Sequence, residues 1–198
     1  MEEINIVYVD DRHDEILSQY LNEIYSKENC KINNKEIEFQ TDMGYESLLH
    51  NDIIIHANIV IIDSRLFENT TASNQKFTGE EFKVLLKKFF PFIEVIVITQ
   101  NEPNPSIGII SKYDSRYGSE GIKYYSDTYT EYIDAAVDSV LQYRELAKKF
   151  NSNDSWEKLL KEKVISSLEG TSNYDELTKD DITELIDTFK KIQVMLDE

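Results

Sequence analysis

Short, uninterrupted runs of Ile and Val are the feature that most constrains how this chain can fold. Four apolar runs occur in the first two-thirds of the sequence, at residues 4–9, 37–40, 59–62 and 95–99. Runs without polar alternation are typical of parallel strands that are covered on both faces. A fifth strand is expected at residues 107–111, after a loop that contains Pro103 and Pro105.

Segments with a helical spacing of apolar residues separate these runs. Apolar stripes cover residues 16–24, 45–49 and 82–89, and Pro91 ends the third of them. A longer stripe predicts a helix that runs from Tyr132 to about Lys149. Because strands that alternate with helices build right-handed βαβ units, we predict an α/β fold with a doubly wound parallel sheet.

The composition changes at residues 151–155, a polar stretch of Asn, Ser and Asp. We therefore predict an α/β domain over residues 1–150 and a helical extension over residues 151–198. In the extension, one apolar stripe stops at Gly170, and a second follows the capping pair of Thr178 and Asp181. The extension is predicted to be a helical hairpin, which either folds back on the first domain or offers a surface for dimerisation or an effector.

The charge balance and the single cysteine exclude several functions. The 198 residues include 21 Lys and Arg against 38 Asp and Glu, a formal net charge of −17. Such a chain shows no basic face for a phosphate backbone, so we expect no nucleic-acid partner. Cys30, the only cysteine, lies in a segment that we expect to be a polar turn, residues 28–35. It excludes an intramolecular disulfide and argues against a cysteine-ligated zinc site.

The sequence also argues against a membrane or export function. Its longest apolar runs are far shorter than the roughly 18 residues of a membrane-spanning helix. Glu2 and Glu3 stand where a secretory signal carries basic residues. The expected location is therefore the cytoplasm, with no membrane partner.

Polar side chains follow four of the predicted strands. Asp10 and Asp11 come after the first strand, Asp63 after the third, Thr99 ends the fourth and Lys112 follows the fifth. Ligands of an open parallel sheet bind beyond the carboxyl ends of its strands, so we expect these groups to converge. Three carboxylates in one cleft need a cation or bound protons, and hard oxygen ligands suit Mg²⁺. The hydroxyl and the ammonium group are suited to hold phosphoryl oxygens.

The order and placement of four segments resemble the receiver domain of bacterial two-component response regulators. These segments are Ile-Val-Tyr-Val-Asp-Asp (6–11), Ile-Val-Ile-Ile-Asp (59–63), Val-Ile-Val-Ile-Thr (95–99) and Ser-Lys (111–112). The resemblance covers approximately residues 4–148 and implies a flavodoxin-like sheet of five parallel strands in the order 2-1-3-4-5. It also implies a phosphorelay switch, in which Asp63 takes a phosphoryl group from a sensor histidine kinase or a phosphotransfer protein.

The resemblance implies a Mg²⁺ site and little enzymatic activity. Asp10, Asp11 and Asp63 look like the acidic ligands, together with the backbone carbonyl of Arg65. Only self-catalysed phosphoryl transfer and autodephosphorylation are expected. A phosphohydrolase with an Asp nucleophile needs an acidic residue two positions later, where Arg12 follows Asp10 and Arg65 follows Asp63.

The remaining part of the resemblance concerns the switch. Thr99 resembles the hydroxyl that swings towards the phosphoryl group, and Lys112 resembles the lysine that pairs with it. Only 12 residues separate these two, so a helix between the fourth and fifth strands is expected to be reduced or missing. If that helix is present, Lys123 takes the lysine's role instead. Gln100, where a small residue normally follows the Thr, and Ile109, at the usual aromatic switch position, are candidate modulators.

The expected output is contact with an unknown effector protein rather than with DNA. A homodimer through the long helix and the hairpin is a further expectation. The departures from the family pattern favour an alternative function, a receiver-like protein-interaction or adaptor module that is not phosphorylated.

Overall fold

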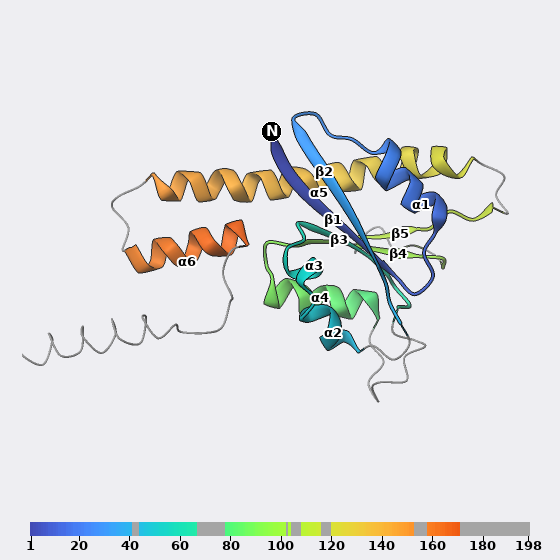
Figure 1. The fold of residues 1–198 in the computed structure, drawn as a ribbon, viewed down its shortest axis with the longest axis horizontal. Helices are drawn as coiled ribbons and strands as arrows, with labels where there is room; N and C mark the ends of the chain where they lie inside the picture. The colour runs from blue at the N-terminus through green and yellow to red at the C-terminus, as the bar shows by residue number, and fades with distance from the viewer. Residues whose placement is uncertain are drawn as a thin grey trace, which may run out of the picture.

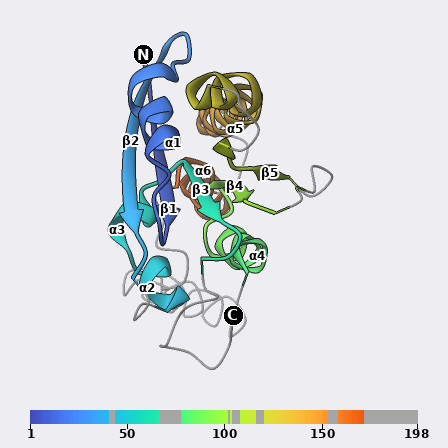
Figure 2. The ribbon, with the colours of Figure 1, turned by 90° about the vertical axis from the view of Figure 1, so that its right-hand side faces the viewer.

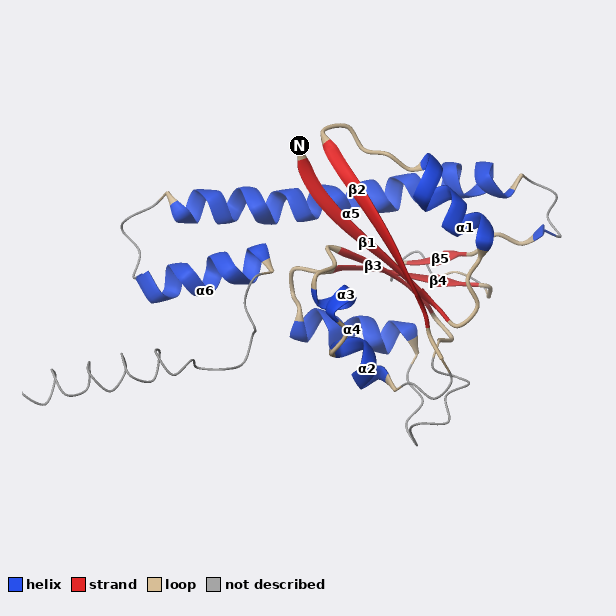
Figure 3. Ribbon diagram, viewed as in Figure 1, coloured by secondary structure: helices blue, strands red, loops and turns tan. Residues whose placement is uncertain are grey.

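A parallel sheet of five strands forms the centre of the protein (Figure 1, Figure 3). The computed structural model describes residues 1–40, 44–66, 78–101, 103, 108–115, 120–152 and 158–170. The strand order is β2-β1-β3-β4-β5, and all neighbouring pairs are parallel. The strands are β1 (Glu2–Asp10), β2 (Cys30–Glu38), β3 (Ile59–Asp63), β4 (Glu94–Thr99) and β5 (Ile109–Ser111). The predicted doubly wound order 2-1-3-4-5 is confirmed, and it is the order of flavodoxin-like folds.

The second strand is longer than its apolar run indicates. β2 begins at Cys30, and its nine residues pair in register with β1, from Cys30 opposite Glu2 to Glu38 opposite Asp10. β2 lies at the edge of the sheet, and only Ile37 of its side chains is buried. The prediction of a polar turn over residues 28–35 is wrong, because an edge strand that faces solvent needs no apolar run.

Helices cover both faces of the sheet and divide its core into two clusters (Figure 2). One face carries α1 (Glu15–Gln19), its π-helical continuation η1 (Tyr20–Ile24) and α5 (Gly121–Asn151). The other carries α2 (Tyr45–Leu49), α3 (Asp52–Ile55) and α4 (Gly79–Phe89). Alternate residues of a strand point to opposite faces, so Ile61 packs with the first cluster and Ile62 with the second.

The connection between β4 and β5 shows no helix among its described residues, which are Gln100, Asn101, Pro103 and Gly108. β5 has three residues and pairs only with the carboxyl-terminal half of β4, from Val97 to Thr99. We expect the helix between these strands to be reduced or missing, and the described part of the connection agrees with this. Lys112 follows β5 directly, and its N–H donates to the Thr99 carbonyl at 2.7 Å.

The predicted extension begins with a helix that lies against α5. α6 (Lys158–Glu169) folds back along the carboxyl-terminal part of α5 (Figure 1). It stops at Gly170, whose φ of +70° is a left-handed conformation that suits glycine. A Cβ at Gly170 would also stand 2.5 Å from the ring of Phe92. The second helix of the hairpin, predicted after Thr178, lies outside the described residues. Within the described residues, no helix is both long and apolar enough to cross a membrane.

α4 begins with a close approach to the end of β3. Thr78 and Glu81 form a capping box, in which each side chain accepts the backbone N–H of the other residue. The N–H of Gly79 donates to the Ser64 carbonyl at 2.8 Å, and a Cβ at Gly79 would stand 2.5 Å from the Asp63 carbonyl oxygen. Glycine is therefore needed at this position, and the contact fixes the backbone of Asp63 against α4.

We expect Gly79→Ala to lower the free energy of unfolding by about 1–3 kcal/mol, because the added methyl group forces α4 away from β3. Gly44→Ala is the control, since a Cβ there meets its nearest atom at 3.9 Å. Urea unfolding of both variants measures the difference. Equal losses in the two variants would contradict the close contact at Gly79.

Candidate functional site

The ends of four strands bring four polar side chains into the protein interior. Asp10 ends β1, Asp63 ends β3, Thr99 ends β4 and Lys112 follows β5. Their exposed fractions are 1%, 7%, 4% and 8%, and they are the buried polar or charged residues of the described part of the chain. The parallel topology explains this convergence, because all four carboxyl ends lie at one edge of the sheet.

Lys112 joins two of the carboxylates. Its Nζ lies 2.6 Å from Oδ2 of Asp10 and 2.6 Å from Oδ1 of Asp63. Burial lowers the pKa of Lys112, but the two carboxylates outweigh burial and raise that pKa above its ordinary value of 10.5. Lys112 is therefore a charged ammonium group at neutral pH, shared between two buried acids.

Asp63 is held on both of its oxygens. Oδ1 faces Lys112, and Oδ2 accepts the backbone N–H of Arg65 at 2.8 Å. Burial raises the pKa of Asp63 above its ordinary value of 3.8, and the Lys112 ammonium opposes this rise. The carbonyl of the same Arg65 is the predicted metal ligand, so the turn after β3 carries both groups.

Asp11 adds a third carboxylate to the cluster. One oxygen from each of Asp10, Asp11 and Asp63 lies within 4.8 Å of the other two. Asp10 and Asp63 are buried, whereas Asp11 is half-buried and reaches solvent. Three carboxylates that open to water on one side fit a hard divalent cation that retains part of its water shell.

The other predicted residues lie in different surroundings. The Thr99 hydroxyl oxygen accepts the N–H of Asn101 at 3.2 Å, and Gln100 between them is exposed. Ile109 packs in the core cluster beneath α4. Of the two candidate lysines, the structure brings Lys112 to the carboxylates, whereas Lys123 lies in the first turn of α5 and is exposed.

Tyr8 also contacts the cluster and is not among the residues predicted for it. It is fully buried, and its hydroxyl donates to Oδ2 of Asp10 at 2.5 Å and accepts the N–H of Asp14 at 3.1 Å. Residues two positions apart in a strand point to the same face, so a tyrosine two positions before Asp10 is the signal for this contact. Burial raises the pKa of Tyr8, so its hydroxyl keeps its proton at neutral pH.

Comparison with known proteins adds three solved structures of response regulators. Neither a protein-family model nor a curated protein sequence matches the chain. A two-component transcriptional regulator AraC from Clostridium phytofermentans ISDg is 15% identical over 72% of this chain and 98% of its own, with a TM-score of 0.40. The response regulator RcsB in complex with DNA is 20% identical over 86% of this chain and 94% of its own, with a TM-score of 0.39. RcsB of Salmonella typhimurium is 18% identical over 95% of this chain and 78% of its own, with a TM-score of 0.37. At these scores the comparisons carry no argument of their own, and the fold assignment rests on the flavodoxin-like sheet order.

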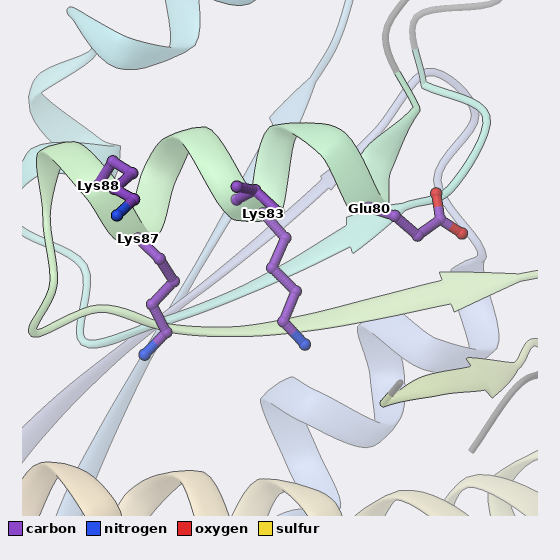
Figure 4. Close-up of a pocket in the computed structure, with 5 residues that line it drawn as sticks. Glu80, Lys83, Lys87 and Lys88 are labelled. Carbon is purple, nitrogen blue, oxygen red and sulfur yellow. The ribbon is translucent and has the colours of Figure 1, made fainter. Parts of the chain in front are cut away.

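The expectation that excludes nucleic acid as a partner is wrong. It is contradicted by these structures, of which one is an RcsB–DNA complex and another concerns DNA interaction by RcsB. Net charge is a sum over the whole chain, whereas contact with phosphate depends on the charge of the local surface. α4 illustrates the difference, because Lys83, Lys87 and Lys88 line one groove of about 530 Å³ together with Glu80 and Val84 (Figure 4).

Lys112→Met should lower the free energy of unfolding by about 3–5 kcal/mol at about pH 7, because it leaves two buried carboxylates without their ammonium partner. The pKa of Asp63 is already raised by burial, and the substitution raises it further. Asp63 then takes up a proton as the pH falls, so the deficit of the variant should shrink between about pH 7 and about pH 5.

Urea unfolding at both pH values measures this effect, with Lys123→Met as the matched control on an exposed lysine. Equal losses in the two variants, or a Lys112→Met deficit that does not change with pH, would contradict the shared ion pair.

Proposed function

We propose that the protein is a phosphorelay signalling switch in which Asp63 accepts a phosphoryl group from a phosphohistidine. The observation that carries this proposal is the 2.6 Å contact of Asp63 with Lys112 beside the carboxylates of Asp10 and Asp11. Phosphoryl transfer to a carboxylate needs a nucleophile, a fixed positive charge and a place for a cation at one point. The receiver-type order of the sheet supports the same function.

The transfer itself is a displacement at phosphorus. An Asp63 oxygen forms the new O–P bond while the bond between phosphorus and the histidine nitrogen breaks, and the leaving imidazole takes a proton from solvent. Asp63 has to be ionised for this attack, and the Lys112 ammonium favours ionisation against the effect of burial. After transfer, Lys112 can turn from the carboxylate to a phosphoryl oxygen and offset the added negative charge.

Asp10, Asp11 and Asp63, with the Arg65 carbonyl, are the residues that would hold Mg²⁺. The ion supplies positive charge to the phosphoryl oxygens when it is bound. This chain's own contribution is to keep the three acids together, and Lys112 and the Arg65 N–H orient Asp63 through its two oxygens.

Thr99 offers a route from the site to the surface. Its oxygen accepts the Asn101 N–H, and its hydroxyl carries a proton that it can donate to a phosphoryl oxygen. A turn of Thr99 towards that oxygen breaks this contact and frees the start of the connection between β4 and β5. Phosphorylation would then produce a second conformation at the start of this connection, next to the exposed Gln100.

Acetyl phosphate with Mg²⁺ should add one phosphate to the protein, seen as a mass increase that is sensitive to alkali and is lost when Mg²⁺ is withheld. Asp63→Asn should abolish the adduct, because an amide does not attack phosphorus. Asp52→Asn, at an exposed carboxylate of α3, is the matched control and should retain it. A folded wild-type protein that forms no adduct would contradict the covalent step.

A second candidate function is a receiver-like module that binds a protein partner without phosphorylation. The closed contact of Lys112 with both Asp10 and Asp63 favours it, because the ammonium group balances the buried charge by itself. The two functions differ in the same experiment: this module would show neither an adduct nor a change in tyrosine fluorescence when Mg²⁺ is added.

A further inference from the structure

Three tyrosines of α5 hold the backbone on both sides of Lys112. The hydroxyls of Tyr124 and Tyr129 each donate to the carbonyl of Ser111 at 2.9 Å. The hydroxyl of Tyr125 accepts the N–H of Tyr113 at 3.0 Å. Ser111 and Tyr113 are the direct neighbours of Lys112 in the chain, so α5 fixes the peptide groups before and after it.

The same contacts continue to Asp10 and close a ring. The Tyr125 hydroxyl donates to the carboxylate of Asp14 at 2.5 Å, and the N–H of Asp14 donates to the Tyr8 hydroxyl at 3.1 Å. Tyr8 donates to Oδ2 of Asp10, the oxygen that also meets Lys112. Tyr8 thus contacts the carboxylate cluster directly, whereas the α5 hydroxyls contact Asp14 and the two chain neighbours of Lys112.

The short fifth strand explains why Lys112 needs such support. β5 has three residues at the edge of the sheet, and the described residues of the connection before it show no helix that would pack against it. Besides its pairing with β4, hydrogen bonds from α5 tether this strand. Burial raises the pKa of Tyr8, Tyr125 and Tyr129, so the hydroxyls remain protonated over the working range of pH.

We propose that these four tyrosines are positioning residues of the site, with Tyr8 setting the carboxylate of Asp10 and the α5 hydroxyls of Tyr124, Tyr125 and Tyr129 setting the ammonium group of Lys112. This division of roles rests on the proposed phosphoryl transfer to Asp63. Tyr8 then governs how well the acids hold Mg²⁺, and the α5 tyrosines govern how well Lys112 meets the transferring group.

Tyr→Phe variants test the hydroxyls while they keep the rings and their packing, such as the edge-on contact of Tyr125 with Tyr129 at 4.7 Å. Tyr8→Phe should weaken Mg²⁺ binding, measured by titration calorimetry, by about tenfold. At saturating Mg²⁺ its rate of adduct formation from acetyl phosphate should stay within about twofold of wild type.

Tyr125→Phe and the double variant Tyr124→Phe/Tyr129→Phe should affect the rate of adduct formation rather than the affinity for Mg²⁺. Their adduct formation at saturating Mg²⁺ should slow by about tenfold to hundredfold, because Lys112 is displaced, while Mg²⁺ affinity changes by less than about twofold. Tyr20→Phe is the control, since the Tyr20 hydroxyl meets Thr130 in the same core and does not belong to the ring. Similar losses in all the variants would leave only a packing role and overturn the proposal.

A measurement without Mg²⁺ separates this proposal from the proposed function. The side-chain ammonium of Lys112, enclosed by two acids, should give a slowly exchanging signal in ¹⁵N-detected NMR of the metal-free protein. Tyr125→Phe should broaden or remove that signal, and Tyr20→Phe should not. An unchanged Lys112 signal in Tyr125→Phe would overturn the α5 part of the proposal. A wild-type protein with this signal but without Mg²⁺ binding or an adduct would instead count against the phosphorelay function alone.

Discussion

The ammonium group of Lys112 lies 2.6 Å from one carboxylate oxygen of Asp10 and 2.6 Å from one of Asp63, and all three side chains are buried. Two carboxylates at this depth repel each other and lose their hydration, and the ammonium group between them offsets both costs. This pairing lets β1 and β3 end side by side with their acids facing inward. The same ammonium group opposes the rise that burial causes in the pKa of Asp63, and so favours the ionised form that the proposed phosphoryl transfer needs.

The support for this ion pair comes from parts of the chain that are far apart in sequence. Gly79 brings the first turn of α4 against the backbone of Asp63. On the other face of the sheet, Tyr125 links α5 to Asp14, which also caps α1. The backbone around the carboxylate edge is thus in contact with helices on both faces of the sheet.

The sequence predicts the strands best where both faces of the sheet are covered. β3, β4 and most of β1 appear as apolar runs because their side chains are mainly buried, whereas β2 is a solvated edge strand without such a run. The acids of the site are predictable for a related reason, since parallel topology alone brings strand ends together. The tyrosine ring is not, because it depends on where α5 lies over residues that precede it by more than a hundred positions. In the sequence, those tyrosines resemble an ordinary apolar stripe.

The account depends on Asp63 acting as the acceptor at a site where Lys112 changes partners. A crystal structure with beryllofluoride and Mg²⁺, which together imitate a phosphoryl group on a carboxylate, tests it most directly. The account predicts beryllium on an Asp63 oxygen, the metal ion against Asp10 and Asp11, and the Lys112 ammonium moved from Asp10 to a fluoride. An Asp63 without beryllium, with Lys112 still held between the two acids, would contradict it.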